Sequence, residues 1–353
     1  MDEKEKLISG YDPNGLSIDG NIFGLPFNPK TADLILLPVP WEVTVSYSAG
    51  TAQGPAHILA ASTQVDLFQK DIKDAWKLGV AYANEPSDLS NQSNQYRALA
   101  EKYIDHLETD NGTYADTDDY LKNINEACCA MVQRIRHEAA RQLNNGKLVG
   151  LVGGDHSTPL GLVQALAEQH GAFGILQIDA HMDLRRAYEG FDYSHASISY
   201  NFMKIPQVER LVQVGIRDFC EEEFKFAEKN SERIRVFYDD DVKNGIFDGE
   251  SWNVITNRII NELPQKVYIS FDVDGLNPDL CPNTGTPVPG GLKFSEATYL
   301  LTKLVKSGRE IIGFDLCEVA PGANEWNGNV GARLLYKLCN LMGVANGKLD
   351  WSD

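Results

Sequence analysis

An aliphatic run that breaks at two glycines occupies residues 148–157, which read LVGLVGGDHS. Its first five residues carry no charged or polar side chain, which is typical of a strand buried inside a sheet. Gly153 and Gly154 then allow a tight turn, and this turn delivers His156 at the carboxyl end of the strand. Ligands of open parallel sheets bind at that end of the strands.

Short apolar runs alternate with longer helical patterns on both sides of this stretch. The candidate strands are 34–39, 148–152, 174–178, 211–215, 267–273 and 311–317. The candidate helices lie near 54–64, 119–145, 159–170, 251–263, 295–307 and 330–342. This order of βαβ repeats predicts an α/β fold with a parallel sheet and helices on both of its faces.

No linker divides the sequence into separate halves. Segment 84–118 is rich in Asn, Asp, Ser and Thr and has no aliphatic cluster, which predicts a surface excursion with one short helix. We therefore expect a single domain over residues 1–353, with an N-terminal extension at 1–33.

Length and charge restrict the partners and the location. At 353 residues and 43% hydrophobic content, the chain can bury a large core without disulfides. Its 32 basic and 50 acidic residues give a net charge of −18, which argues against nucleic acid and anionic membranes as partners. Residues 1–6 lack the apolar core of a signal peptide, and the six cysteines show no C-x-x-C spacing. We expect reduced thiols and a cytoplasmic protein.

Two further candidate strands end in polar motifs. Residues 179–183 read DAHMD after the strand 174–178, and residues 270–275 read SFDVDG around the end of the strand 267–273. If the strands are neighbours, the three motifs converge on one site. Together they supply five carboxylates and two histidines, a cluster that is hard to ionise without a cation.

A pair of divalent metal ions is the simplest partner for such a cluster. Oxygen ligands with some imidazole and no thiolate suit manganese or a similar six-coordinate ion better than tetrahedral zinc. Carboxylates shared between two ions would hold the ions a few ångströms apart and lower the pKa of a bridging water towards neutrality.

Each motif also has a purely structural interpretation. Asp and His often satisfy the backbone of a turn, and an isolated Asp-x-Asp is often solvated. Three such motifs in one βαβ chain favour the metal site. The remaining helical histidines have charged or polar neighbours and are expected at the surface or at helix ends: His57, His106, His137 and His170.

The three motifs resemble those of the ureohydrolase family, which comprises arginases, agmatinases, guanidine hydrolases and formimidoylglutamases. The third motif continues to TGTP at 284–287, and the similarity covers roughly residues 34–345. Asn277 departs from the Asp that the family more often has before this proline, but the matched metal ligands precede it. The resemblance implies a three-layer α/β/α fold around an eight-stranded parallel sheet, and a homotrimer or homohexamer.

The resemblance also implies two divalent ions, manganese by family default and nickel as an alternative. One ion would take His156, Asp179, Asp183 and Asp272, and the other Asp179, His181, Asp272 and Asp274. A hydroxide between the ions would attack the guanidino carbon and release urea, or formamide in the formimino branch. Asp183 would accept a hydrogen bond from the hydroxide and pass a proton onward.

Two more residues match catalytic positions of that family. His195 lies where the family has a histidine that gives a proton to the leaving amine, although a surface histidine is the alternative. Glu318 matches a glutamate that holds the guanidinium through paired hydrogen bonds, although an exposed glutamate at a strand end is the alternative.

The substrate is inferred from residues 184–195, which read LRRAYEGFDYSH. Arginases hold the amino-acid head with an Asn in this loop, and no matching Asn is present. The three aromatic residues of the loop, together with Trp41, Tyr47 and Trp326, would fill the space of a long substrate tail, unless they serve packing or a subunit interface. The segment looks most like bacterial agmatinases and the guanidine hydrolases among them. We therefore expect a guanidine hydrolase, with agmatine as the next choice and arginine or formiminoglutamate after it.

Two other classes of function are considered. A deacetylase-like enzyme with one zinc ion would need a paired-histidine motif, and the sequence contains no His-His dipeptide. A metal-binding regulatory member without catalysis would lose metal ligands, whereas all six matched ligands are present.

Overall fold

The computed structural model describes residues 1–84, 88–109 and 117–352. Within these residues the centre is a sheet of eight strands, all paired in parallel, in the order β2-β1-β3-β8-β7-β4-β5-β6. The strands are β1 (Leu34–Val39), β2 (Val80–Tyr82), β3 (Leu148–Gly153), β4 (Phe173–Ile178), β5 (Val208–Ile216), β6 (Ile234–Tyr238), β7 (Lys266–Asp272) and β8 (Glu310–Cys317). The predicted eight-stranded parallel sheet is confirmed.

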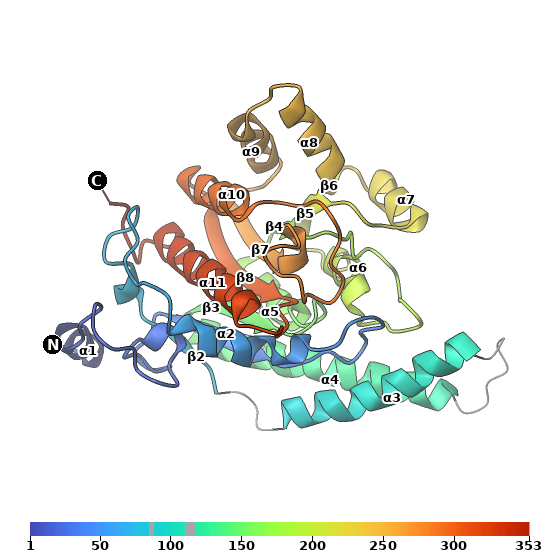
Figure 1. The fold of residues 1–353 in the computed structure, drawn as a ribbon, viewed down its shortest axis with the longest axis horizontal. Coiled ribbons are helices and arrows are strands. Elements are labelled where there is room, and N and C mark those ends of the chain that lie inside the picture. The colour runs from blue at the N-terminus through green and yellow to red at the C-terminus, as the bar shows by residue number, and fades with distance from the viewer. Residues whose placement is uncertain (85–87, 110–116, 353) are drawn as a thin grey trace.

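Helices flank this sheet in two layers, which gives the expected three-layer α/β/α arrangement (Figure 1). In one layer α11 packs against α2 and α10, and α10 packs against α9. In the other layer α4 packs against α3 and α5, and α5 packs against α6. The bounds are α1 (Glu3–Gly10), α2 (Gly54–Ser62), α3 (Leu89–Thr109), α4 (Thr117–Asn144), α5 (Leu160–His170), α6 (Ile198–Met203), α7 (Glu221–Lys229), α8 (Asp239–Phe247), α9 (Trp252–Asn261), α10 (Phe294–Lys306) and α11 (Trp326–Ala345).

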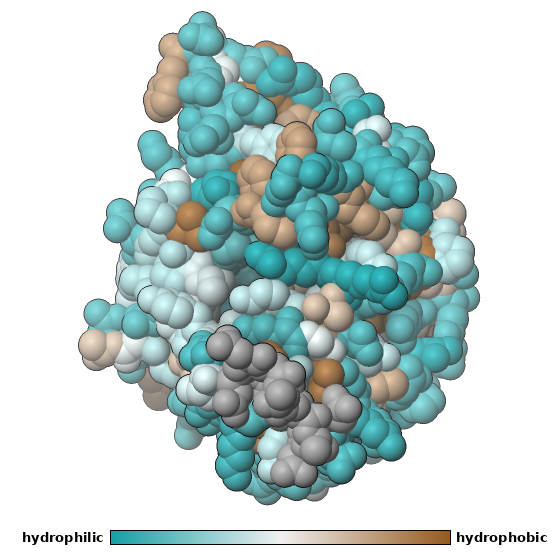
Figure 2. Space-filling view, turned by 90° about the vertical axis from the view of Figure 1, so that its right-hand side faces the viewer, coloured by the Kyte–Doolittle hydropathy of each residue, from teal (hydrophilic) through white to brown (hydrophobic). Residues whose placement is uncertain are grey.

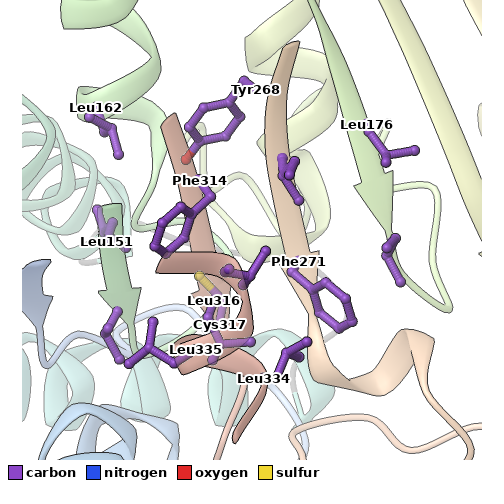
Figure 3. Close-up of a cluster of buried hydrophobic side chains, with 14 of the residues drawn as sticks. Leu151, Leu162, Leu176, Tyr268, Phe271, Phe314, Leu316, Cys317, Leu334 and Leu335 are labelled. Atoms are coloured by element: carbon purple, nitrogen blue, oxygen red, sulfur yellow. The ribbon is translucent and has the colours of Figure 1, made fainter. Parts of the chain in front are cut away.

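Most strand residues on both faces are apolar because helices cover both sides of the sheet. Every residue of β1 and β4 is buried. Figure 3 shows side chains from β3, β7, β8 and α11 meeting in this core. Gly150 of β3 makes room for the ring of Phe314, because a Cβ at Gly150 would lie 2.5 Å from that ring. Such close packing leaves little freedom in how β3 and β8 lie side by side.

The predicted strands and helices are present, each within a few residues of its expected ends. The strands β2 and β6 are additional to those predicted. The prediction of one short helix in segment 84–118 is wrong, because α3 alone runs for 21 residues. Residues 85–87 and 110–116 of that segment lie outside the described part of the chain.

Hydrophilic residues predominate on the face of the molecule that Figure 2 shows. Across the three described ranges, no helix combines the length and the apolar composition that crossing a membrane requires.

Candidate metal centre

The four central strands of the sheet bring the predicted site residues together. His156 follows β3, residues 179–183 follow β4, Asp272 ends β7, and Glu318 follows β8. Because β3, β8, β7 and β4 are consecutive neighbours, residues from distant parts of the sequence meet at one edge of the sheet. The order of the strands in the sequence does not by itself predict which strands are neighbours in the sheet.

The first group of ligands surrounds the ring of His156. Its Nδ1 lies 3.0 Å from Asp179 Oδ2, 3.3 Å from Asp183 Oδ2 and 3.4 Å from Asp272 Oδ2. All four side chains are buried. Within the described part of the chain, Nδ1 has no hydrogen-bond partner, which suits an atom that donates its lone pair to a metal ion.

The second group of ligands surrounds the ring of His181. Its Nδ1 lies 3.0 Å from Asp274 Oδ2 and 3.7 Å from Asp179 Oδ1. Asp179 therefore offers one carboxylate oxygen to each group, as a ligand shared by two ions must. Asp272 contacts the first group, and its sharing with the second group stays a prediction.

The buried carboxylates of Asp272 and Asp183 lack enough positive charge nearby to ionise freely. Burial, together with the neighbouring Asp274 and Asp179, raises the pKa of Asp272 well above its ordinary value. Burial and Asp179 raise the pKa of Asp183 to about 7. Burial disfavours the charged form of His181, but Asp274 and Asp179 outweigh it and raise its pKa to about 12. Divalent ions would supply the positive charge that the buried carboxylates otherwise take from protons.

Two of the predicted catalytic residues adopt left-handed backbone conformations. Asp183 has a φ of 54° and Glu318 a φ of 66°. Residues other than glycine adopt this conformation only where the surrounding structure holds them, and such residues cluster at functional sites. Glu318 directly follows the end of β8, and Asp183 ends the short motif that follows β4.

Glu318 lies against the first ligand group and points an oxygen towards the TGTP segment. Its Oε1 accepts a hydrogen bond of 2.9 Å from the backbone N–H of His156. Its Oε2 is buried and has no partner among the described residues, and a Cβ at Gly285 would lie 2.7 Å from this oxygen. A buried carboxylate oxygen without a partner is a ready acceptor for a guanidinium N–H.

His195 begins a short turn after the loop 184–194. Burial and the nearby His181 and His156 lower its pKa to about 4, so the imidazole is neutral at pH 7. The ring of Tyr188 meets it edge-on, with 6.4 Å between the ring centroids. The structure thus brings His195 within electrostatic reach of His156 and His181, the two histidines predicted as metal ligands.

The sequence matches a family model described as the arginase family over residues 32–340. The chain belongs to the arginase family. It is 30% identical over 331 residues to an N(1)-aminopropylagmatine ureohydrolase of Thermus thermophilus, covering 93% of this chain and 97% of that protein. It is 28% identical to a guanidinobutyrase of Pseudomonas aeruginosa, covering 90% and 89%. The structure of the agmatine ureohydrolase of Thermoplasma volcanium shares the fold, with a TM-score of 0.69, 21% identity and 98% and 99% coverage.

Members of the arginase family are binuclear metal enzymes. This chain is a hydrolase that acts on carbon–nitrogen bonds of amidines. The two groups of ligands described above are where this arginase-family chain could hold its ions. None of four further histidines joins either group within the described ranges: His57, His106, His137 and His170.

A buried hydrogen-bond chain behind His156 was not predicted from the sequence. The Nε2 of His156 lies 2.9 Å from Ser270 Oγ and 3.6 Å from Asp315 Oδ1. The hydroxyl of Tyr268 donates to Asp315 Oδ2 at 2.7 Å. If Ser270 accepts from Nε2–H, the lone pair of Nδ1 is free for a metal ion. The available signal was Asp315 itself, a buried carboxylate in a strand whose other residues after Glu310 are apolar.

A second supporting chain holds Asp179 in place. Gln177 donates from Nε2 to Asp179 Oδ2 at 2.8 Å, and its Oε1 accepts from Ser199 and from Gln213. All of these side chains are buried. Gln177 in β4 and Gln213 in β5 are thus buried polar residues that support the candidate metal ligand Asp179 through hydrogen bonds.

Proposed function

We propose that this protein is a ureohydrolase that cleaves the guanidino carbon–nitrogen bond of agmatine or a closely related aminoalkyl guanidine, releasing urea. The observation that carries the proposal is Asp179, whose two oxygens face two separate histidine groups. Manganese is the ion proposed first, because oxygen ligands with imidazole suit it, and nickel is the alternative.

Bound divalent ions would lower the pKa of a water molecule so that it can attack a guanidino carbon near neutral pH. The side chains around them orient the substrate and move protons. Glu318 holds the guanidinium through its unpartnered Oε2. Asp183 accepts a proton from the attacking water, and this proton reaches the leaving nitrogen through His195. A carbon–oxygen bond forms, the carbon–nitrogen bond breaks, and the amine leaves protonated.

The aromatic residues that argue for free guanidine are mostly packed elsewhere. Trp41 is 1% exposed and belongs to the core, and Phe191 is fully buried against Tyr103 of α3. Tyr47 is 77% exposed. Among these residues only Tyr188 has a described contact with His195, so a pocket closed by aromatic rings has little support.

The relatives and the charge of the site support a longer, positively charged substrate. Aminopropylagmatine, guanidinobutyrate and agmatine, which the names of the relatives mention, all carry the guanidino group on a four-carbon chain. Asp218 is 68% exposed beside His181, with 4.0 Å between Oδ2 and Nε2. An exposed carboxylate there and a net charge of −18 favour a cationic tail over an anionic one.

The test is urea release by purified protein loaded with Mn²⁺ or with Ni²⁺. The substrates are agmatine, aminopropylagmatine, guanidinobutyrate, arginine and free guanidine. We expect the highest kcat/KM with agmatine or aminopropylagmatine and a lower value with the anionic guanidinobutyrate. A tenfold preference for free guanidine would instead establish a guanidine hydrolase. No urea from any substrate, with two metals bound, would favour a regulatory protein.

A further inference from the structure

The helices α3 and α4, named here the helical arm, lie between β2 and β3 in the sequence. They pack against each other along one side of the molecule (Figure 1). The sequence suggests only a surface excursion for part of this arm. The arm nevertheless contacts residues 184–195, named here the histidine loop because His195 ends it.

Asn125 of α4 binds the backbone of the histidine loop through both ends of its amide. Its Nδ2 donates to the carbonyl of Gly190 at 3.1 Å, and its Oδ1 accepts from the N–H of Asp192 at 2.9 Å. Two hydrogen bonds from one planar group fix both the position and the orientation of the loop segment.

The arm also packs against the loop between these two hydrogen bonds. The ring of Phe191 is fully buried and meets Tyr103 of α3 in an edge arrangement, with 5.4 Å between centroids. A Cβ at Gly190 would lie 2.9 Å from Leu121 of α4, so the loop backbone lies directly against the helix. The apolar contact and the two hydrogen bonds act on the same three loop residues.

The held segment leads directly to His195. Glu189, which is not a glycine, has a φ of 53°, so the turn at this residue needs support from its surroundings. The N–H of Phe191 closes the turn on the carbonyl of Tyr188 at 2.9 Å, and the ring of Tyr188 faces His195. On the other side of the loop, Asn201 donates to the carbonyl of Asp192 at 2.9 Å.

From these contacts we infer that Asn125 is a positioning residue for catalysis. It holds the histidine loop so that His195 keeps its place beside the metal centre. This inference rests on the proposed proton-relay role of His195. Asn125 then supports catalysis from the helical arm, although it does not touch the reacting atoms.

The test is a double-mutant cycle on kcat with Mn²⁺-loaded protein. Asn125→Ala should lower kcat by about 10- to 100-fold, because small displacements of a catalytic group have effects of this size. His195→Asn alone should lower kcat by roughly two to four orders of magnitude. Asn125→Ala added to His195→Asn should then cause little further loss, since both changes remove the same function.

Matched variants and a second readout exclude a general loss of structure. Glu126→Ala changes the adjacent, exposed residue of α4 and should leave kcat unchanged. Asn125→Asp keeps the volume and the acceptor for Asp192 but loses the donor to Gly190, so it should fold and show an intermediate kcat. The bound metal per chain should stay at two in every variant, because none of the changed residues belongs to either group of candidate ligands.

Three results would be decisive against the inference. An unchanged kcat in Asn125→Ala and Asn125→Asp would show that the hydrogen bonds do not matter for catalysis. Equal losses from Asn125→Ala with and without His195 would show that Asn125 acts through something else. A normal kcat in His195→Asn would disprove the proposed relay role of His195. Because this single variant does not involve Asn125, it separates that failure from a failure of the inference about Asn125.

Discussion

Asp179 is the residue that the two halves of the candidate metal centre share. One oxygen faces His156 and the other faces His181, while Gln177 fixes the orientation of the carboxylate. Replacing one oxygen by an amide nitrogen removes a ligand from one of the two groups. The consequences should therefore appear in metal binding before they appear in folding.

We predict that Asp179→Asn binds fewer than two metal ions per chain and loses turnover. Removal of a supporting residue outside the ligand shell typically weakens metal binding by about 10- to 100-fold, so loss of a shared ligand should exceed that. Elemental analysis after dialysis and far-ultraviolet circular dichroism measure the two effects. Two bound metals with a normal rate would disprove the shared-ligand assignment.

Ser270 tests the support behind His156. Ser270→Ala removes the partner of Nε2 and the link towards Asp315, so the ring can rotate or take the wrong tautomer. We expect Mn²⁺ affinity to fall by about 10- to 100-fold. Titration with a chelator as competitor gives the affinity. Ser295→Ala, at an exposed position of α10, is the control and should bind Mn²⁺ normally.

At the level of elements, the sequence predicted the long aliphatic strands and the polar motifs at their ends. It did not predict β2 and β6, the two strands at the edges of the sheet. The strand β2 has only three residues, and β6 carries the exposed Arg235, so neither shows a buried apolar run. In α3 the buried face includes Ser93 and Ala100, which gives a weak helical pattern. Ser270 and Asp315 are cross-strand partners of β7 and β8, a relation that requires the register of the sheet. The contact of Asn125 with Gly190 spans 65 residues.

The turn after β3 connects three strand ends and tolerates no side chain at Gly154. The carbonyl of Gly154 accepts a hydrogen bond from the N–H of Glu318 at 2.8 Å. The N–H of Gly154 donates to the carbonyl of Val39, also at 2.8 Å. A Cβ at Gly154 would lie 2.1 Å from the carbonyl oxygen of Trp41. We predict that Gly154→Ala lowers the free energy of unfolding by about 1–3 kcal/mol or more and weakens metal binding.

Chemical denaturation of the metal-loaded protein measures the effect of Gly154→Ala. Gly10→Ala, where a Cβ meets nothing within 4 Å, is the matched control and should change stability by less than about 0.5 kcal/mol. Equal stability of the two variants would show that the turn can relax around a methyl group.

At the scale of the whole molecule, the metal centre links stability to pH. In the folded state the pKa of His181 is raised to about 12, while an unfolded chain has the ordinary value near 6.5. Above pH 6.5 the folded state therefore keeps a proton that the unfolded state loses. Folding stability then falls as pH rises, by about 1.4 kcal/mol per pH unit for each proton retained.

We predict that protein stripped with a chelator melts at a lower temperature at pH 8.5 than at pH 6.5. The pKa values of Asp183 and Asp155 are raised to about 7 each, so these groups also lower folding stability as the pH rises, up to about pH 7. His195, with a pKa of about 4, acts oppositely, but only between pH 4 and 6.5. Mn²⁺-loaded protein should show a smaller change, because metal ions replace the protons. A melting temperature that rises over this range in the stripped protein would contradict the prediction.

The position of β8 has a consequence for how the protein is made. This strand lies between β3 and β7 in the sheet, yet it comes after both in the chain. A nascent chain that has emerged from the ribosome only as far as residue 309 holds all six metal-ligand residues but lacks the strand that separates β3 from β7. His156 and Asp272 can then reach their native spacing only after the last eighth of the chain has been synthesised and β8 has been inserted. The group around His156 is therefore completed only when β8 is in place, whereas the group around His181 comes from the directly paired strands β4 and β7.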